Sequence, residues 1–238
     1  MIMKYAVVTG GSGQLGKSFI KTLLENNYFV YSIDLDKPKK KHPSIKYVSL
    51  DITSEKEVKF FFKDLKNLDL LVNNAGIGVF TPILKRTAKE FSDVMNVNLL
   101  GTFLMSQKAL KIMKKKKYGK IINIGSVYGM KSSDQKIYGK SGRNNSEVYS
   151  ASKAGVIMLT KYLASHFASN NIQINCISPG GIYRNQDKEF VKKYSLKTPT
   201  GRMADTKDMQ SIFKMLISKD ANYINGINIP VDGGFTSW

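Results

Sequence analysis

The chain has 238 residues, of which 42% are hydrophobic, so it is long enough for one α/β domain with a core on both faces of a sheet. This composition excludes a disordered chain, and no apolar run approaches the roughly 20 residues of a membrane span. The formal net charge is +19, but almost all of the excess is lysine, and aromatic residues do not interleave with the densest runs, Lys37–Lys41 and Lys114–Lys117. We therefore expect neither nucleic-acid nor membrane binding.

Strand-like runs alternate with helical runs along the chain, which predicts βαβ units and a parallel sheet. We place strands at 4–9, 28–33, 46–50, 69–73, 119–124, 172–177 and 226–231. We place helices at 14–26, 54–65, 87–116, 147–169 and 205–218. No repeat, heptad or long linker interrupts this pattern, so residues 1–238 are expected to form a single doubly wound domain of about seven strands.

Two segments do not fit regular structure: 127–146, which is rich in Gly, Ser and Asn, and 179–204. Irregular segments of this length in a compact domain are usually functional. The single cysteine, Cys176, lies in the apolar stretch 172–177, so we expect a buried thiol. Met1 leads directly into a strand-like segment, and we therefore expect a cytoplasmic protein without a signal peptide.

A glycine-rich turn follows the first strand. Gly11, Gly13 and Gly16 satisfy the pattern G-x-G-x-x-G between a strand and an amphipathic helix. Glycines let the backbone turn tightly and approach a pyrophosphate at the helix N-terminus, although such turns can also merely connect a strand to a helix. Asp34 ends the next strand, 18 residues beyond Gly16, where an acid can bind the adenosine ribose hydroxyls or simply form a turn.

A carboxylate at this position would repel a 2′-phosphate, so Asp34 favours NAD(H) over NADP(H). Three nearby lysines, Lys37, Lys39 and Lys40, could compensate for that repulsion. Asp51 follows the third strand and is a candidate for a position beside the adenine. We expect no metal ion.

Tyr149 and Lys153 are separated by four residues inside a predicted helix, so both side chains should lie on one face. A tyrosine with a pKa of about 10 is a poor base at neutral pH, and a neighbouring ammonium favours the phenolate. No other tyrosine in the chain has a lysine four residues further on. The pair therefore predicts a general acid–base group with a cation that lowers its pKa.

Seven segments in chain order resemble motifs of the short-chain dehydrogenase/reductase family, and together they cover nearly the whole chain. These segments are Thr9–Gly16, Asn73–Gly76, Asn96–Leu99, Ile122–Ser126, Tyr149–Lys153, Pro179–Gly180 and Val231–Gly234. The resemblance implies a Rossmann fold and a catalytic tetrad of Asn98, Ser126, Tyr149 and Lys153. The cofactor contacts that it implies, together with those argued above, are Gly10, Ser12, Gly13, Gln14, Leu15, Gly16, Asp34, Asp51, Ile52, Asn73, Ala75, Gly76, Tyr149, Lys153, Pro179, Gly180 and Ile182.

The chemistry implied by this resemblance is hydride transfer between a nicotinamide and a secondary alcohol or ketone. Tyr149 would act as general acid or base, and Lys153 would lower its pKa and bind the ribose. Ser126 would donate a hydrogen bond to the substrate oxygen, and Asn98 would hold a water on the proton path.

The chain also departs from the commonest family pattern. Ser126 and Tyr149 are 23 residues apart, about twice the usual spacing, so we expect residues 131–147 to form a lobe over the active site that contacts substrate or a neighbouring subunit. Arg184 stands where the family often has threonine. Three segments resemble oxidoreductases of flagellin and surface-glycan modification, which would make the substrate a sugar, a sugar phosphate or a polyol. They are the insertion with Ile137 and Tyr138, the run Pro179–Ile182 followed by Asn185 and Gln186, and the ending Asp232–Trp238. Arg143, Arg184 and Lys188 could then bind phosphate or carboxylate.

Two other functions remain open at this point. A 3-oxoacyl-thioester reductase of lipid synthesis would be expected to use NADPH, against which Asp34 and the insertion count. A non-catalytic cofactor sensor would not need Ser126, Tyr149 and Lys153 together. The resemblance further implies a homotetramer, or a dimer, in which helices 87–116 and 147–169 pack against a symmetry mate and Trp238 is buried between subunits.

Overall fold

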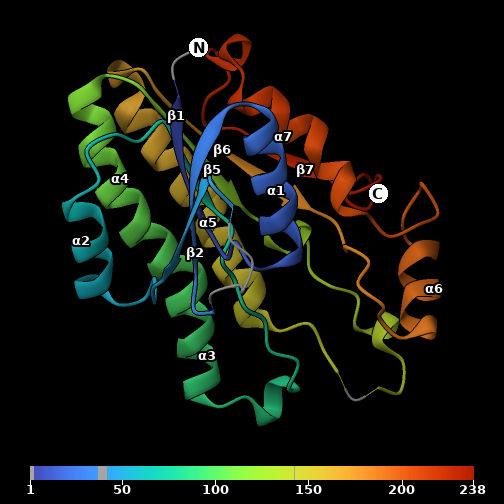
Figure 1. Cartoon of the computed structure of the whole chain (residues 1–238). Helices are drawn as coiled ribbons and strands as arrows, with labels where there is room; N and C mark the ends of the chain where they lie inside the picture. The colour runs from blue at the N-terminus through green and yellow to red at the C-terminus, as the bar shows by residue number, and fades with distance from the viewer. Residues whose placement is uncertain (1–2, 37–41, 142) are drawn as a thin grey trace.

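The computed structural model describes residues 3–36, 42–141 and 143–238, and these form a three-layer α/β fold around one seven-stranded sheet (Figure 1). All neighbouring strands are parallel, in the order β3-β2-β1-β4-β5-β6-β7. The strands are β1 Lys4–Thr9, β2 Tyr28–Asp34, β3 Ile45–Ser49, β4 Leu70–Asn73, β5 Gly119–Ile124, β6 Ile172–Pro179 and β7 Asn228–Val231. The predicted doubly wound architecture is confirmed. The strand order reverses between β1 and β4, which is where such sheets bind ligands.

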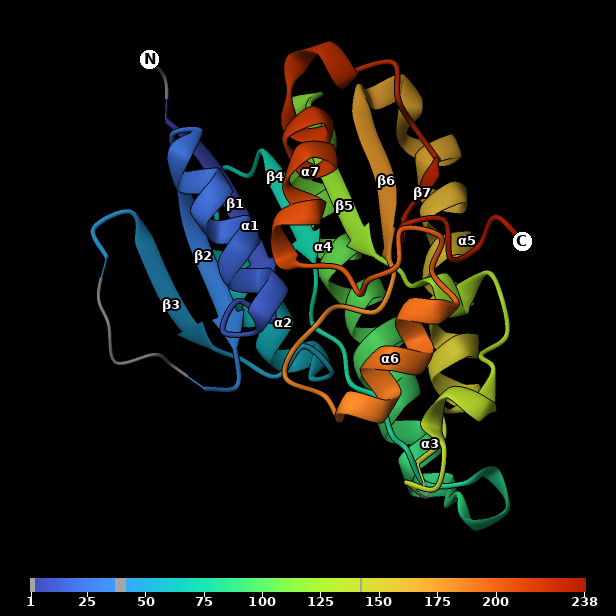
Figure 2. The same ribbon diagram turned by 90° about the vertical axis from the view of Figure 1, so that its right-hand side faces the viewer.

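Two apolar clusters pack on opposite faces of the sheet, because central strands bury side chains on both sides. One cluster joins the strands to α2 Glu55–Lys63, α4 Thr102–Lys116 and α5 Glu147–Phe167. The other joins them to α1 Gln14–Glu25 and α7 Gln210–Ile217, with Phe19 and Phe213 in ring contact at 4.5 Å. Figure 2 shows α1 and α7 side by side on one face.

The predicted helix 87–116 is interrupted. It consists of α3 Ala88–Met95, a π-helical segment Asn96–Gly101 and α4, and the π segment carries Asn98. Within it, the Thr102 hydroxyl donates to the Asn98 carbonyl at 2.7 Å. Single π turns within α-helices often mark functional sites, and here the turn rotates Asn98 into the buried interior.

The segment 179–204, which we expected to be irregular, contains a helix, α6 Lys188–Leu196. Asp187 caps this helix by accepting hydrogen bonds from the amides of Glu189 and Phe190. The described residues of the segment 127–146 have only short turns of 3₁₀ helix, at Val127–Gly129 and Gln135–Tyr138. Within the described residues, no helix combines the length and apolar character needed to cross a bilayer.

Candidate active site

The glycine turn between β1 and α1 has the geometry of a phosphate-binding turn. Gly10 has φ +63°, and a Cβ there would lie 2.8 Å from the Ala75 backbone. A Cβ on Gly16 would lie 2.2 Å from the Gly10 carbonyl oxygen, so both positions need glycine. Helix α1 begins at Gln14 after Gly13, and no side chain caps its first amides. Those amides and the helix dipole are therefore available to an anion, and the residues present fit a dinucleotide pyrophosphate.

Asp34 lies beside this turn, at the end of β2. Its Oδ2 accepts a hydrogen bond from the Ser12 amide at 2.9 Å, and its Oδ1 accepts one from the Leu35 amide at 2.9 Å. The carboxylate is thereby fixed next to the turn, where it can meet the adenosine ribose. Lys37, Lys39 and Lys40, which we considered as compensating cations, lie outside the described residues.

Asp51 and Ile52 follow β3 at the adenine end of the predicted site. Asp51 Oδ1 accepts hydrogen bonds from the Thr53 amide and hydroxyl, both at 2.8 Å, which orients the carboxylate. The Ile52 side chain is buried against Gly101, so only the Ile52 backbone can contact a cofactor.

The segment after β4 combines a core residue with residues that line the site. The buried Asn73 amide donates to Ser106 Oγ at 2.9 Å and to Asn123 Oδ1 at 2.8 Å, so the Asn73 side chain stabilises the sheet and does not reach a cofactor. Asn74, which sequence reasoning did not select, donates to the Thr9 and Gly10 carbonyls at 3.1 and 2.9 Å. It ties this segment to the glycine turn, and its place in the Asn73–Gly76 motif was the available signal.

The turn after β6 lies against the glycine turn. The Gly180 amide donates to the Val231 carbonyl at 2.9 Å, which fixes the end of β6 to β7. The Gln14 side-chain amide donates to the Tyr183 carbonyl at 2.9 Å, so a residue of the first helix holds the segment after Pro179. The Gln186 side-chain amide donates a hydrogen bond to the Ile182 carbonyl at 2.8 Å. The backbone amide of Ile182 is then the group that could bind the carboxamide of a nicotinamide.

The structure brings the four tetrad residues together at the carboxyl edge of the sheet. Tyr149 and Lys153 lie in the first turns of α5, and Lys153 Nζ is 5.8 Å from the Tyr149 ring centroid. Ser126 follows β5, and its hydroxyl acts to lower the pKa of the Tyr149 phenol, so the two groups lie within reach of each other. Lys153 Nζ donates to the Ile124 carbonyl at 2.7 Å, which anchors the ammonium to β5.

Asn98 completes the tetrad beside Gly76. Its Oδ1 accepts from the Ile77 amide at 2.8 Å, and its Nδ2 donates to the Ile77 carbonyl at 3.0 Å and to Ser152 Oγ at 2.9 Å. A Cβ on Gly76 would lie 3.3 Å from Asn98 Oδ1 and 3.4 Å from Lys153 Nζ, so both side chains converge there. Ser152, buried on α5, is a positioning residue that the sequence motif did not reveal.

The electrostatics correct one prediction. Burial raises the pKa of Tyr149, against the opposing effects of the Ser126 hydrogen bond and the Arg184 charge. Burial likewise lowers the pKa of Lys153 to about 8. The prediction that Lys153 lowers the phenol pKa is therefore wrong for the protein alone, because both groups lose hydration and the charge that favours the phenolate is that of Arg184.

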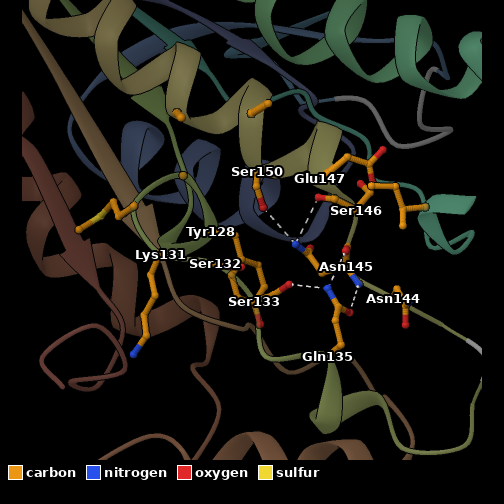
Figure 3. Close-up of a pocket in the computed structure, with 15 residues that line it drawn as sticks. Tyr128, Lys131, Ser132, Ser133, Gln135, Asn144, Asn145, Ser146, Glu147 and Ser150 are labelled. Atoms are coloured by element: carbon orange, nitrogen blue, oxygen red, sulfur yellow. Dashed lines mark hydrogen bonds between the residues drawn. The ribbon is translucent and has the colours of Figure 1, made fainter. Parts of the chain in front are cut away.

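The insertion is anchored to the first turns of α5 at Ser150. The Asn145 amide donates to Gln135 Oε1, and Gln135 Nε2 donates to the Asn145 carbonyl, both at 3.1 Å. Asn145 Nδ2 also donates to Ser150 Oγ at 3.2 Å (Figure 3). A cavity of about 540 Å³ lies here, and it is lined by Tyr128–Ser133 and Asn144–Glu147 among others, with none of the tetrad in its wall.

A small apolar cluster joins the insertion to α6 and to the C-terminal segment. Tyr138 of the insertion packs on Phe190 of α6 at 5.2 Å between ring centroids, and Tyr194 stacks on Phe235 at 4.8 Å. The Tyr194 hydroxyl accepts a hydrogen bond from the Gly181 amide at 2.5 Å, which links the cluster to the turn after β6. The insertion, α6 and the C-terminal segment are therefore packed into one unit that is linked to the turn after β6, and contact of this unit with a substrate stays a prediction.

The phosphate turn, the acid at the end of β2 and the Tyr149–Lys153–Ser126–Asn98 group together define a dinucleotide-dependent oxidoreductase of the Rossmann type. Comparison with known proteins identifies the family within this class. The family described as short chain dehydrogenase matches residues 4–195. The 3-oxoacyl-(acyl-carrier-protein) reductase FabG of Buchnera aphidicola is 35% identical over 246 residues, covering 97% of this chain and 96% of the relative.

Two solved structures are also similar. A short chain dehydrogenase of Leptospira borgpetersenii with bound NAD⁺ has a TM-score of 0.93 and is 42% identical, covering 98% of this chain and 93% of that one. A gluconate 5-dehydrogenase of Burkholderia cenocepacia in complex with NADP and tartrate has a TM-score of 0.90 and is 25% identical, covering 100% and 97%. The chain belongs to the short-chain dehydrogenase/reductase family and is an NAD(P)-dependent oxidoreductase acting on alcohol or ketone groups.

Proposed function

We propose that Tyr149 transfers the proton in the interconversion of a ketone and a secondary alcohol. The observation that carries this is the convergence of the tetrad: Lys153 Nζ lies 5.8 Å from the Tyr149 ring, and the Ser126 hydroxyl acts to lower the pKa of the Tyr149 phenol. A bound nicotinamide supplies or accepts the hydride at the carbonyl carbon. In the reductive direction Tyr149 donates its proton to the substrate oxygen, and Ser126 donates a hydrogen bond to the same oxygen. Lys153 and Asn98 lie on the path by which the Tyr149 phenol regains its proton.

The preferred cofactor is proposed to be NAD(H). Asp34 is held by the Ser12 and Leu35 amides beside the glycine turn, which supports a role in binding the adenosine ribose, and a second phosphate there would meet a carboxylate. The Leptospira structure was solved with NAD⁺ and the Burkholderia structure with NADP, so the family allows either choice.

Replacing Asp34 tests the preference. We expect kcat/KM with NADH to exceed that with NADPH, and Asp34→Ser to lower the NADH value about tenfold while raising the NADPH value, because a charged hydrogen-bond acceptor is lost. The control is Asp36→Ser, which removes an exposed carboxylate two residues further on. If the ratio of kcat/KM with NADH to that with NADPH is unchanged in Asp34→Ser, the carboxylate does not bind the adenosine ribose.

Two substrate classes have support from different observations. The name of the curated relative favours 3-oxoacyl thioesters, which gives this class the stronger support from comparison. The finer resemblance to flagellin and surface-glycan enzymes has no support in that name. A sugar-derived or hydroxy-acid substrate is favoured instead by the lobe of insertion and α6 over the site and by the gluconate dehydrogenase similarity. A purely cofactor-sensing role has no observation in its favour.

The test of the proposed function is turnover of keto-sugar, oxo-acid and 3-oxoacyl thioester panels, followed by the absorbance of NADH and NADPH. We expect reduction of at least one class by the wild-type protein. If neither cofactor is consumed with any class, while NADH binds, the oxidoreductase assignment for this chain's tetrad fails.

For the assembly, we propose a tetramer, or a dimer, formed through the outer faces of α4 and α5 in a cytoplasmic protein. Phe103, Met158 and Tyr162 are exposed there, beside a groove of about 300 Å³. Trp238 is 72% exposed in the single chain, whereas Phe235 is buried, so burial of Trp238 between subunits would have to come from a neighbour.

A further inference from the structure

Arginine is rare in this chain, and its four positions divide into two pairs. Only four of the 37 basic residues are arginines. Arg86 is buried and pairs with Glu147 at 3.2 Å, and Arg202 forms two bonds to Asp208 at 2.7 and 2.8 Å. Arg143 and Arg184 have no carboxylate partner within residues 3–36, 42–141 and 143–238. The two arginines without a structural ion pair lie on the insertion and on the segment after β6.

Arg143 is stacked on an aromatic ring of the segment between β4 and α3. Its guanidinium lies 4.0 Å from the Phe80 ring centroid, and the amide of Asn144 donates to the Phe80 carbonyl at 3.0 Å. Two residues before Phe80, a Cβ on Gly78 would lie 3.5 Å from the Tyr149 ring. One short segment therefore contacts both the catalytic phenol and Arg143. Stacking fixes the plane of the guanidinium and leaves its N–H groups available to a ligand.

Arg184 approaches the phenol from the opposite segment. Its amide donates to Gln186 Oε1 at 2.7 Å, and Gln186 in turn donates to the Ile182 carbonyl at 2.8 Å. The preceding residue, Tyr183, is bound by Gln14 of the first helix. The backbone of Arg184 is thus fixed between the cofactor turn and the active site, while its side chain is exposed.

The surrounding acids do not cancel these charges. Asp134 pairs with Lys197 at 2.5 Å, Glu189 pairs with Lys193 at 2.6 Å, and Asp187 caps α6. The charge of Arg184 acts to lower the pKa of Tyr149, so its guanidinium lies within electrostatic reach of the catalytic phenol, whereas the charge of Arg143 acts on Tyr138 of the insertion. Helix α6, which follows Arg184 in the chain, and the insertion, which carries Arg143, lie side by side (Figure 2).

We propose that the substrate carries an anionic group, a carboxylate or a phosphate, which Arg184 and Arg143 bind beside the reacting carbon. A planar guanidinium binds such groups through two parallel hydrogen bonds, which lysine cannot do, and this accounts for arginine at these two positions in a lysine-rich chain. The proposal rests on the oxidoreductase function above and narrows its substrate to an oxo acid, a sugar acid or a sugar phosphate. The tartrate in the gluconate 5-dehydrogenase complex is a hydroxy acid of this kind.

The test compares matched ketones that differ in one charge. Initial rates with saturating NADH are measured on the full chain for an oxo acid and its neutral amide, and for a keto-sugar and its phosphate. Tartrate and inorganic phosphate serve as inhibitor probes. The variants are Arg184→Gln, Arg184→Lys and Arg143→Gln. The control is Lys192→Gln, which removes an exposed charge from α6.

We expect Arg184→Gln to raise KM for one anionic ketone about tenfold to a hundredfold, with KM for its neutral partner unchanged. Arg143→Gln should act in the same direction, and Arg184→Lys should restore only part of the affinity. Comparing the oxo acid with its amide, and the keto-sugar with its phosphate, shows whether the two arginines bind a carboxylate or a phosphate. Inhibition by the corresponding probe should weaken in parallel, and Lys192→Gln should behave as wild type.

Three results would overturn the proposal. Equal losses on the anionic and neutral ketones would show that Arg184 only tunes the phenol. A matching loss of NADH affinity, measured by fluorescence titration, would assign Arg184 to the cofactor. Efficient reduction of neutral 3-oxoacyl thioesters with no effect of Arg184→Gln would leave the oxidoreductase function intact and remove the anion site, so the two failures are distinguishable.

Discussion

Tyr149→Phe is expected to lower kcat about a thousandfold while the Kd for NADH changes less than about threefold. The variant keeps the ring and its packing but has no proton to give to the substrate oxygen, and a positioned general acid typically contributes 10²–10⁴-fold. Hydride transfer would then deposit an alkoxide beside Ser126 with only one hydrogen-bond donor. Stopped-flow absorbance of NADH with the best substrate gives kcat, and fluorescence titration gives the affinity.

Tyr138→Phe is the matched control for this substitution. Tyr138 is also a phenol near the site, but it packs on Phe190 of α6 and is not part of the group formed by Asn98, Ser126 and Lys153. The control should retain kcat within a few-fold. Turnover by Tyr149→Phe close to that of Tyr138→Phe would reject Tyr149 as the acid and base.

Lys153→Met is expected to abolish most activity without destabilising the protein at neutral pH. Lys153 is 5% exposed, and burial lowers the pKa of its ammonium to about 8 from the usual 10.5. Between these two values the unfolded chain binds the proton more tightly, so this group makes the wild type more stable as pH rises from about 8 to 10.5. Methionine has no such dependence. The advantage in melting temperature of the variant over the wild type should therefore shrink across that window.

Lys120→Met separates the catalytic effect from the burial effect. Lys120 is also buried, burial lowers its pKa to about 8, and its Nζ donates to the Ser218 carbonyl at 2.8 Å, away from the tetrad. Both variants should show the same pH trend in thermal melts, but only Lys153→Met should lose kcat, by about a hundredfold or more. A pH-independent difference in melting temperature for Lys153→Met would contradict the depressed pKa.

Much of the fold followed from the sequence because its parallel strands are buried on both faces and read as short apolar runs between turns. All seven predicted strands are confirmed, with ends shifted by at most two residues. Helix α6 was missed because its cap, Asp187, and its apolar positions lie inside a stretch without a clear period. The π segment at Asn98 was missed because a one-residue change in hydrogen-bond spacing leaves no mark on hydrophobic periodicity.

The candidate site divides in the same way. The order of the motifs predicted which residues meet, because the carboxyl ends of neighbouring parallel strands share one edge of the sheet. Contacts between distant segments had no such local signal: Ser152 behind Asn98, Asn74 on the glycine turn, and Gln14 on Tyr183. The direction of the Tyr149 pKa was also mistaken, since a spacing of four residues says nothing about hydration.

By itself, the sequence determined the alternation of strands and helices, the glycine turn and the identity of the reacting side chains, because each depends on residues close together in the chain. Only the tertiary structure decided how deeply Tyr149 and Lys153 are buried and which arginines remain without a carboxylate. Hydration and charge pairing depend on segments far apart in the chain that the fold brings into contact, and the local pattern does not contain them.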